Sequence, residues 1–237
     1  MNINIGHLYP DLLNLYGDRG NVICIKKRCE WRGIDVNIKR FNLEDEINFA
    51  ELDFLFLGGG SDRDQYLVCK KLIEKKDEIK NYVENSGVLL AICGGYQLLG
   101  HYYMMKIETI EGLSILDIRT NYEDEKRLIG DIVIENKELG TKIAGFENHS
   151  GRTYINGHTP LGQVIKGFGN NQTAENEGVI YKNTIGTYLH GPLLPKNPIL
   201  ADNIISRILK KKYSDFTVLT PLDDTLELKA NKFICER

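Results

Sequence analysis

Apolar runs alternate with helical patterns along the first half of the chain. The clearest run, Val88–Ile92, contains no polar residue, which is typical of a strand buried on both faces of a parallel sheet. Further strands are expected over 2–8, 34–41 and 52–57. One helix is expected to end near Trp31, before Gly33, and a charged amphipathic helix is expected to run to about Asn85. This alternation predicts an α/β fold.

The second half of the chain has shorter strand-like runs joined by irregular links. They are expected over 113–118, 128–135, 142–146 and 164–168. We interpret them as an antiparallel extension of the parallel sheet, carried in the same domain. A further run ends at His190, because the following Gly191-Pro192 cannot continue a strand ladder. A closing helix is expected over 199–212, and residues 214–237 are expected to form a tail or a peripheral hairpin.

Composition narrows the class of protein. The 237 residues fit one α/β domain with a modest extension, and 42% hydrophobic with 27% charged residues are ordinary globular values. A net charge of −3 gives no reason to expect nucleic acid or an anionic membrane as a partner. No signal peptide or transmembrane run is recognised. The five cysteines are odd in number and scattered, so we expect a reduced, cytoplasmic protein without a disulfide framework.

Cys93 directly follows the apolar strand and precedes Gly94 and Gly95, after which a helical pattern begins. A strand that turns sharply into a helix through small residues has the geometry of a nucleophile elbow. The start of the helix would favour the thiolate over the thiol. A buried core cysteine is the alternative, but the flanking glycines favour a nucleophile.

A second strand ends in three glycines, Gly58 to Gly60, one strand–helix unit before Cys93. Glycines at such a turn let backbone N–H groups approach a ligand closely. A phosphate-binding loop is one interpretation, although its characteristic Lys-Ser/Thr ending is absent. The other is an oxyanion site in which the amide of Gly59 or Gly60 faces Cys93.

Histidines and one arginine are the remaining polar candidates. His190 lies at the end of a strand, where open α/β sheets place their ligands, and is a candidate general base, with a packing role as the alternative. His149 and His158 lack metal-ligand spacing and are expected to be loop or hydrogen-bonding residues, so no metal site is expected. From the residues alone, a solvated Arg127 is favoured over a carboxylate-binding one.

Cysteine on an elbow, glycine amides one strand away and a histidine at a later strand end together indicate thiol-based acyl transfer. Three stretches resemble the class I glutamine amidotransferases, in their cobyric-acid-synthase-like branch. They are Gly58-Gly-Gly-Ser-Asp-Arg-Asp-Gln65, Ile92-Cys-Gly-Gly-Tyr-Gln-Leu-Leu-Gly100 and Gly186-Thr-Tyr-Leu-His-Gly-Pro192. This resemblance implies a flavodoxin-like α/β fold with a mostly parallel central sheet and an antiparallel extension.

Further runs resemble the GatD family, the glutaminase subunits of lipid II isoglutaminyl synthase. They are Leu15-Tyr-Gly-Asp-Arg-Gly-Asn21, Arg127-Leu-Ile-Gly-Asp131, Gly145-Phe-Glu-Asn-His-Ser-Gly-Arg-Thr153 and Leu189-His-Gly-Pro-Leu-Leu-Pro-Lys196. The likeness extends to about residue 212, so an amidotransferase domain is expected over 1–212 and a C-terminal extension over 213–237.

The resemblance also implies roles for individual residues. Cys93 would be the nucleophile and His190 its partner. The oxyanion site would use Gly59 or Gly60 together with the Gly94 amide. Gln97 would line the glutamine pocket, and Arg127 would anchor the α-carboxylate of glutamine.

One departure concerns the third catalytic group. Other class I amidotransferases have a Glu two residues after the histidine, whereas this chain has Pro192 there. Either the enzyme works with a dyad, or a partner supplies the carboxylate. We favour a partner, because an orienting acid normally fixes the imidazole tautomer.

The resemblance finally implies a heterodimer. A MurT-like Mur-ligase subunit would bind ATP, Mg²⁺ and lipid II, and would use ammonia from L-glutamine to convert D-glutamate to D-isoglutamine. No cofactor is expected in this chain. Alternatives are a glutaminase for cobyrinate or cobyrate amidation, a catalytically silent binding subunit of the same fold, and a cysteine hydrolase of another small amide or ester.

Overall fold

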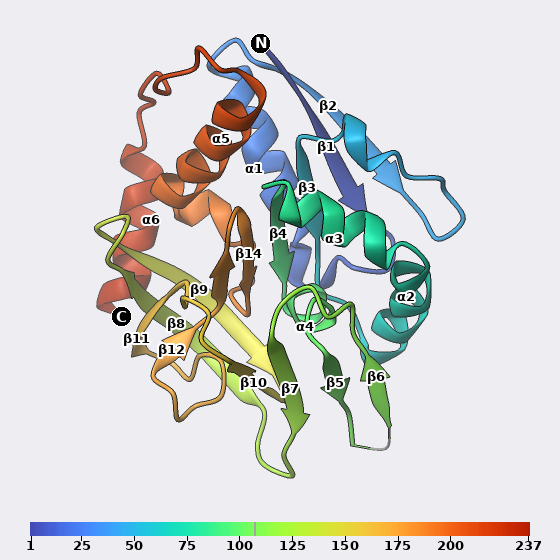
Figure 1. Ribbon diagram of the computed structural model, residues 1–237. Coiled ribbons are helices and arrows are strands. Elements are labelled where there is room, and N and C mark those ends of the chain that lie inside the picture. The colour runs from blue at the N-terminus through green and yellow to red at the C-terminus, as the bar shows by residue number, and fades with distance from the viewer. Residues whose placement is uncertain (107) are drawn as a thin grey trace.

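A six-stranded, mostly parallel sheet forms the centre of the molecule. The computed structural model describes residues 1–106 and 108–237 (Figure 1). The strand order is β2-β1-β3-β4-β14-β13, and only the edge strand β13 runs antiparallel to its neighbour. The strands are β1 (Asn2–Leu8), β2 (Asp35–Phe41), β3 (Phe54–Leu57), β4 (Val88–Ile92), β13 (Val179–Tyr181) and β14 (Thr184–Thr187). This order confirms the predicted flavodoxin-like arrangement.

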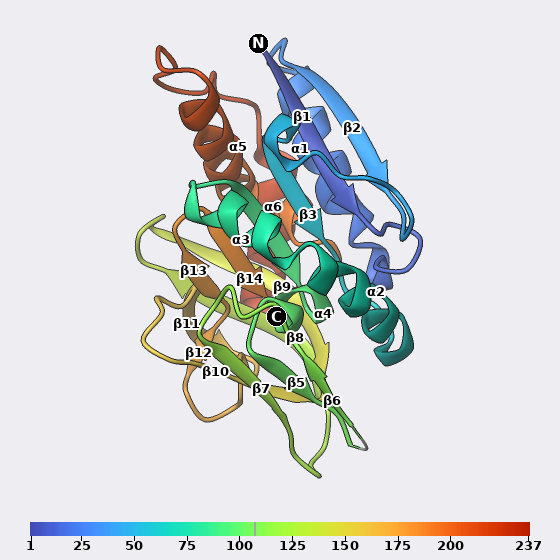
Figure 2. The same cartoon turned by 45° about the vertical axis from the view of Figure 1, so that its right-hand side comes forward.

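Helices lie on both faces of this sheet (Figures 1 and 2). In the sheet, β2 lies on the side of β1 toward one edge, whereas β4 lies on the side of β3 toward the opposite edge. Because such crossovers are right-handed, their helices pack on opposite faces. The first face has α1 (Arg19–Glu30) beside α5 (Pro198–Lys212), and the second has α2 (Asp62–Glu74) and α3 (Lys76–Glu84). Short 3₁₀ turns cover Leu15–Gly17, Phe49–Glu51 and Leu194–Lys196.

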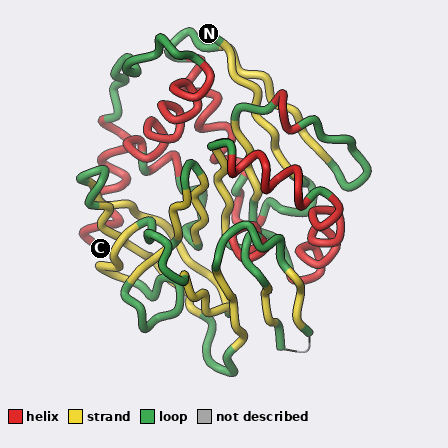
Figure 3. The backbone as a smooth tube through the Cα atoms, in the orientation of Figure 1, coloured by secondary structure: helices red, strands yellow, loops and turns green. Residues whose placement is uncertain are grey.

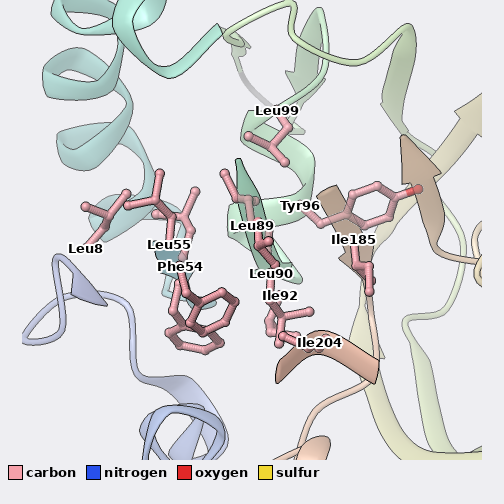
Figure 4. Close-up of a cluster of buried hydrophobic side chains, with 14 of the residues drawn as sticks. Leu8, Phe54, Leu55, Leu89, Leu90, Ile92, Tyr96, Leu99, Ile185 and Ile204 are labelled. Atoms are coloured by element: carbon pink, nitrogen blue, oxygen red, sulfur yellow. The ribbon is translucent and has the colours of Figure 1, made fainter. Parts of the chain in front are cut away.

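The core surrounds β4, whose residues are all buried. Side chains of β3 and β14 flank it, and Ile204 of α5 packs below (Figure 4). Burying a Leu, Ile or Phe side chain contributes about 1.5–3 kcal/mol, so this strand is held firmly at the sheet centre. In the register, Leu57 of β3 pairs with Ala91 and Thr187 of β14 with Ile92. The three strands therefore end at one edge of the sheet.

The remaining strands form two separate four-stranded sheets, and only β13 extends the central sheet. The first has the order β10-β7-β5-β6, with β5 (Tyr102–Met104), β6 (Thr109–Glu111), β7 (Ile118–Tyr122) and β10 (Gly151–Ile155). The second has the order β12-β11-β8-β9, with β8 (Leu128–Asn136), β9 (Thr141–His149), β11 (Gly162–Lys166) and β12 (Asn176–Glu177). Both lie beyond the end of the central sheet at which β3, β4 and β14 stop (Figure 2).

The predicted strand over 113–118 is wrong. Its backbone instead bonds to the end of α4 (Gly94–Leu98): Leu113 N–H donates to Leu98 O at 2.8 Å, and Leu116 N–H donates to Leu99 O at 3.0 Å. The apolar side chains are buried as expected, but a loop that satisfies helix carbonyls buries them equally well.

Two helical predictions also change (Figure 3). The helix expected to run to Asn85 breaks at Lys75 into α2 and α3, within a run of charged residues that offers no apolar side chain to the sheet. The C-terminal stretch, expected as a tail or hairpin, contains the helix α6 (Thr225–Glu236). The proposed boundary at residue 212 stays a prediction.

Candidate active site

Cys93 occupies a strained turn between β4 and α4. Its backbone has φ 50° and ψ −106°, a conformation that costs about 1–3 kcal/mol and that clusters at functional sites. The following glycines are required, because a Cβ on Gly94 would lie 2.2 Å from Gln65 Nε2 and one on Gly95 would lie 2.6 Å from Leu57 O. Cys93 is 6% exposed and lines a pocket. The predicted elbow is therefore present, and its thiol opens into a cavity.

His190 is placed beside this elbow. It lies three residues beyond β14 and is anchored to β9, since His190 N–H donates to Phe146 O at 2.7 Å. A Cβ on Gly59 would lie 2.9 Å from His190 Cε1 and 3.1 Å from Cys93 Cβ. The three residues thus converge at the carboxyl edge of the sheet, where the sequence predicts them.

A carboxylate of this chain orients the imidazole. His190 Nδ1 donates to Asp18 Oδ1 at 3.1 Å, and both side chains are fully buried. The other oxygen, Asp18 Oδ2, accepts from Gly59 N–H at 2.9 Å. This chain therefore places a carboxylate of its own at the imidazole, whereas the contribution of an acid by a partner stays a prediction. The Glu missing after His190 is replaced by an acid from the β1–α1 connection.

Electrostatics favour a charged imidazole. Burial lowers the pKa of His190, but the charge on Cys93 and the hydrogen bond to Asp18 raise it, and the net result is about 10. His190 Nε2 has no hydrogen-bond partner among the described residues. This nitrogen is therefore available to the sulfur or to a reacting group, with a proton to give.

The contact between Gly59 and Asp18 favours Gly60 over Gly59 as the oxyanion donor. The Gly59 N–H is engaged by Asp18, so it is not available to a ligand. In the described part of the chain, no hydrogen bond uses the N–H groups of Gly60 and Gly94. Gly60 lines the pocket, and Gly94 follows the nucleophile.

The pocket in front of Cys93 has a volume of about 230 Å³. Among the predicted residues, Gly60, Cys93, Gln97 and Arg127 line it. Sequence reasoning did not select the other lining residues, which are Leu15, Ser61, Asp62, Gln65, Tyr103, Asn148, His149 and Ser150. The size suits a small polar molecule.

Arg127 reaches the pocket from the residue before β8. Its Nε donates to Asn148 Oδ1 at 3.0 Å and its Nη2 to Asn148 O at 3.2 Å. Asn148 also contacts the Tyr16 hydroxyl, and the Tyr16 ring packs edge-on against His190 with centroids 5.1 Å apart. Arg127 is exposed, as the residues alone suggest, but Asn148 holds its guanidinium at the pocket.

Polar side chains behind the pocket hold Gln97. Gln97 Nε2 donates to Tyr188 Oη at 3.0 Å, and Tyr188 shares a 2.6 Å hydrogen bond with Thr153 Oγ1. The His149 ring stacks on Tyr188 at 3.5 Å, and burial lowers the pKa of His149. The neutral His149 donates from Nδ1 to Gly151 O, which confirms its hydrogen-bonding role.

The Leu15–Asn21 stretch was noted for resemblance, and the structure explains its density of polar residues. Besides Asp18 and Tyr16, Asn21 Oδ1 accepts from Leu194 N–H at 2.8 Å. A Cβ on Gly20 would lie 2.5 Å from Pro192 Cγ. Asp18 could have been proposed from the sequence, because it is an acid in the loop that follows the first strand. That loop begins at the sheet edge where Cys93 and His190 lie.

Comparison with known proteins places this site in a family. The sequence profile of the CobB/CobQ-like glutamine amidotransferase domain matches residues 4–198. The chain belongs to the CobB/CobQ-like glutamine amidotransferases. A solved structure described as a glutamine amidotransferase shares the amidotransferase fold, with a TM-score of 0.57 over 86% of this chain and 98% of that one at 15% identity.

Relatives within the CobB/CobQ-like family differ in how much of their length is shared. The subunits GatD of the glutamine-hydrolysing lipid II isoglutaminyl synthases of Streptococcus pneumoniae and Staphylococcus aureus are 43% and 44% identical. These alignments cover 94% and 99% of this chain, and 87% and 96% of the relatives. The cobyric acid synthase of Listeria innocua is 31% identical, over 75% of this chain but 35% of its own length.

Two searches of the described residues were negative. No helix there has the length and apolar character needed to cross a membrane. No cluster of three or more His, Cys, Asp or Glu side chains in residues 1–106 and 108–237 could hold a metal ion.

Proposed function

We propose that this chain is the glutamine-hydrolysing, GatD-type subunit of a lipid II isoglutaminyl synthase. The proposal rests on the similarity to two GatD subunits, at 43% and 44% identity. These alignments cover most of this chain and most of each relative. The Cys93–His190–Asp18 arrangement supplies the chemistry. Cobyrate amidation is less well supported, because the chain spans about a third of the cobyric acid synthase it resembles.

In the first half-reaction, the Cys93 thiolate attacks the side-chain carboxamide carbon of glutamine. The N–H groups of Gly60 and Gly94 stabilise the oxyanion that forms. His190 Nε2–H gives its proton to the amide nitrogen as the C–N bond breaks, so ammonia leaves and a γ-glutamyl thioester remains. Asp18 stabilises the imidazolium and fixes its orientation.

In the second half-reaction, His190 is neutral and takes a proton from water. The resulting hydroxide attacks the thioester carbon, and the oxyanion again lies at Gly60 and Gly94. The C–S bond then breaks, which releases glutamate and restores the thiolate beside imidazolium. Arg127, held by Asn148, binds the α-carboxylate through both half-reactions.

The ammonia serves a second subunit. A MurT-like Mur-ligase subunit, forming a heterodimer with this chain, would bind ATP and Mg²⁺ and activate the D-glutamate carboxylate of lipid II. Ammonia would then give D-isoglutamine in the peptidoglycan stem. This division of labour is supported by the two GatD relatives, which are subunits of glutamine-hydrolysing synthases.

The test uses the chain co-purified with its synthase subunit, supplied with lipid II, ATP and Mg²⁺. We expect amidated lipid II with either glutamine or ammonium chloride as the nitrogen source. The Cys93→Ala complex should lose the reaction with glutamine and keep that with ammonium chloride. Cys24→Ala, on α1 away from the pocket, is the matched control and should keep both. Amidation of cobyrinate but not lipid II would overturn the acceptor assignment.

A further inference from the structure

Apart from the Cys93 sulfur, the pocket carries two formal charges of opposite sign. Arg127 is the cation among its lining residues, and Asp62 is the carboxylate. His149 also lines the pocket, but burial lowers its pKa and leaves it neutral. Glutamine enters with a carboxylate and an ammonium on its α-carbon. Arg127 accounts for only one of these groups.

Asp62 is held in a defined orientation. It opens α2, directly after Ser61, whose side chain caps the helix by accepting from Asp64 N–H. The Tyr103 hydroxyl, from β5 across the pocket, donates to Asp62 Oδ1 at 3.3 Å. Tyr103 is 4% exposed whereas Asp62 is exposed, so a buried hydroxyl holds one oxygen of a carboxylate that faces solvent and the pocket. No hydrogen bond within the described chain uses Asp62 Oδ2, which leaves one oxygen for a ligand.

We propose that Asp62 binds the α-ammonium group of glutamine, while Arg127 binds the α-carboxylate. The proposal rests on the glutaminase function argued above and assigns the amino-acid selectivity of that site. A charged hydrogen bond from ammonium to carboxylate contributes about 1.5–3 kcal/mol. The site would therefore prefer glutamine over 4-carbamoylbutanoate, which has the same carboxamide and carboxylate but no ammonium.

The experiment compares Asp62→Asn with the unchanged chain, each in complex with the synthase subunit. We expect the KM for glutamine to rise about 10- to 100-fold, because losing the ammonium–carboxylate hydrogen bond weakens binding by about a factor of ten for every 1.36 kcal/mol. The kcat should change less than about threefold. The inhibition constant of 4-carbamoylbutanoate should be the same for both proteins, because that ligand has no group for Asp62. Asp77→Asn, exposed in the first turn of α3 and outside the pocket, is the matched control and should leave the glutamine KM unchanged.

Two results would overturn the assignment. An unchanged KM for glutamine would show that Asp62 does not bind the ammonium. An equal loss of affinity for both ligands would show that Asp62 only supports the pocket through Tyr103. Failure of the unchanged complex to hydrolyse glutamine would instead contradict the proposed function, so the two proposals are tested separately.

Discussion

Gly59 is the residue around which the site is assembled. Its N–H holds Asp18, and its Cα lies against both His190 and Cys93. The glycine is required by space, since a Cβ there would stand 2.9 Å from His190 Cε1. The triple glycine suggests Gly59 or Gly60 as an oxyanion donor, but in the structure the Gly59 N–H holds the Asp18 carboxylate instead.

Gly59→Ala should therefore lower kcat about 100-fold or more, while the chain stays folded. The added methyl group pushes the imidazole away from the sulfur, and misplacement of about 1 Å at a reacting centre costs about that factor. Glutaminase kinetics and near-UV circular dichroism measure the two effects. Gly33→Ala, at the open end of α1, should keep its kcat. Equal kcat for Gly59→Ala and the unchanged chain would contradict the geometry.

Asp18→Asn should shift the pH dependence of glutaminase activity. The variant presents an amide NH₂ to His190 Nδ1, so the pKa of His190 falls from about 10 and the alkaline limb of kcat/KM moves to lower pH. Loss of the orienting carboxylate should also lower kcat about 10²- to 10⁴-fold. Rates between about pH 6 and pH 10 would show both effects.

The exposed Asp11, earlier in the same connection, provides the control for that experiment. Asp11→Asn should reproduce the unchanged profile. If Asp18→Asn also leaves the alkaline limb in place, Asp18 does not set the protonation state of His190.

At the scale of elements, the local pattern of apolar and polar residues predicted the central strands. Val88–Ile92 is a strand over the predicted residues, because a parallel strand covered on both faces carries a continuous apolar run. Asn2–Leu8 is also a strand over the predicted residues, and there the signal was alternation of polar and apolar residues. Cys93 and His190 followed from them as strand-end residues. Leu113–Ile118 was misread because an apolar run shows burial but not which backbone groups receive the hydrogen bonds.

The helix α6 could not be predicted because its attachment is polar and distant in sequence. Arg28 of α1, 2% exposed, makes a fork of two hydrogen bonds to Asp224, which precedes α6, and a third to Asp202 of α5. No residue of α6 is itself buried. Periodicity reveals a helix that buries an apolar face, whereas α6 is anchored by the Arg28–Asp224 pair just before it and by hydrogen bonds from Asn231 to Lys142 O and Asn197 Oδ1.

Asp224→Asn should consequently destabilise the chain by about 2–3 kcal/mol. Removing one partner leaves the buried Arg28 guanidinium with less charge compensation, and the cost is at the low end for buried pairs because Asp224 keeps 20% exposure. Urea unfolding would measure the difference. Asp215→Asn, exposed in the same segment, should change stability by less than about 0.5 kcal/mol. A similar small change for Asp224→Asn would show that α6 is held by other contacts.

At the scale of the whole molecule, the site is the junction of three sheets. Cys93 and Gly59 follow strands of the central sheet, Asn148 lies on β9 with Arg127 just before β8, and Tyr103 lies on β5 of the third sheet. The nucleophile and its histidine follow strands of the central sheet and were predictable as strand-end residues. Asp18 and Asp62 lie on loops and helix ends, where no period constrains position, so only the assembled fold brings them to the pocket.

Glu177 joins the β12-β11-β8-β9 sheet to the end of β14, just before His190. It lies on β12, accepts from Tyr188 N–H at 2.7 Å and from Thr187 Oγ1, and is fully buried. Burial raises its pKa from 4.5 to about 8, although these hydrogen bonds act in the opposite direction. The folded chain therefore keeps a proton on Glu177 over a pH range in which the unfolded chain has lost it.

This difference predicts the sign of a pH effect on stability. The contribution from protonated Glu177 is fully present below about pH 4.5 and is lost as the pH rises toward about 8, so the free energy of unfolding should fall across that window. Glu177→Gln keeps a neutral side chain at every pH and should flatten the fall, with its largest advantage near pH 8. Chemical unfolding at several pH values measures the slope, and the exposed Glu175→Gln should retain it. An unchanged slope in Glu177→Gln would mean that this carboxyl is already ionised in the folded chain, and that the sheet junction tolerates its charge.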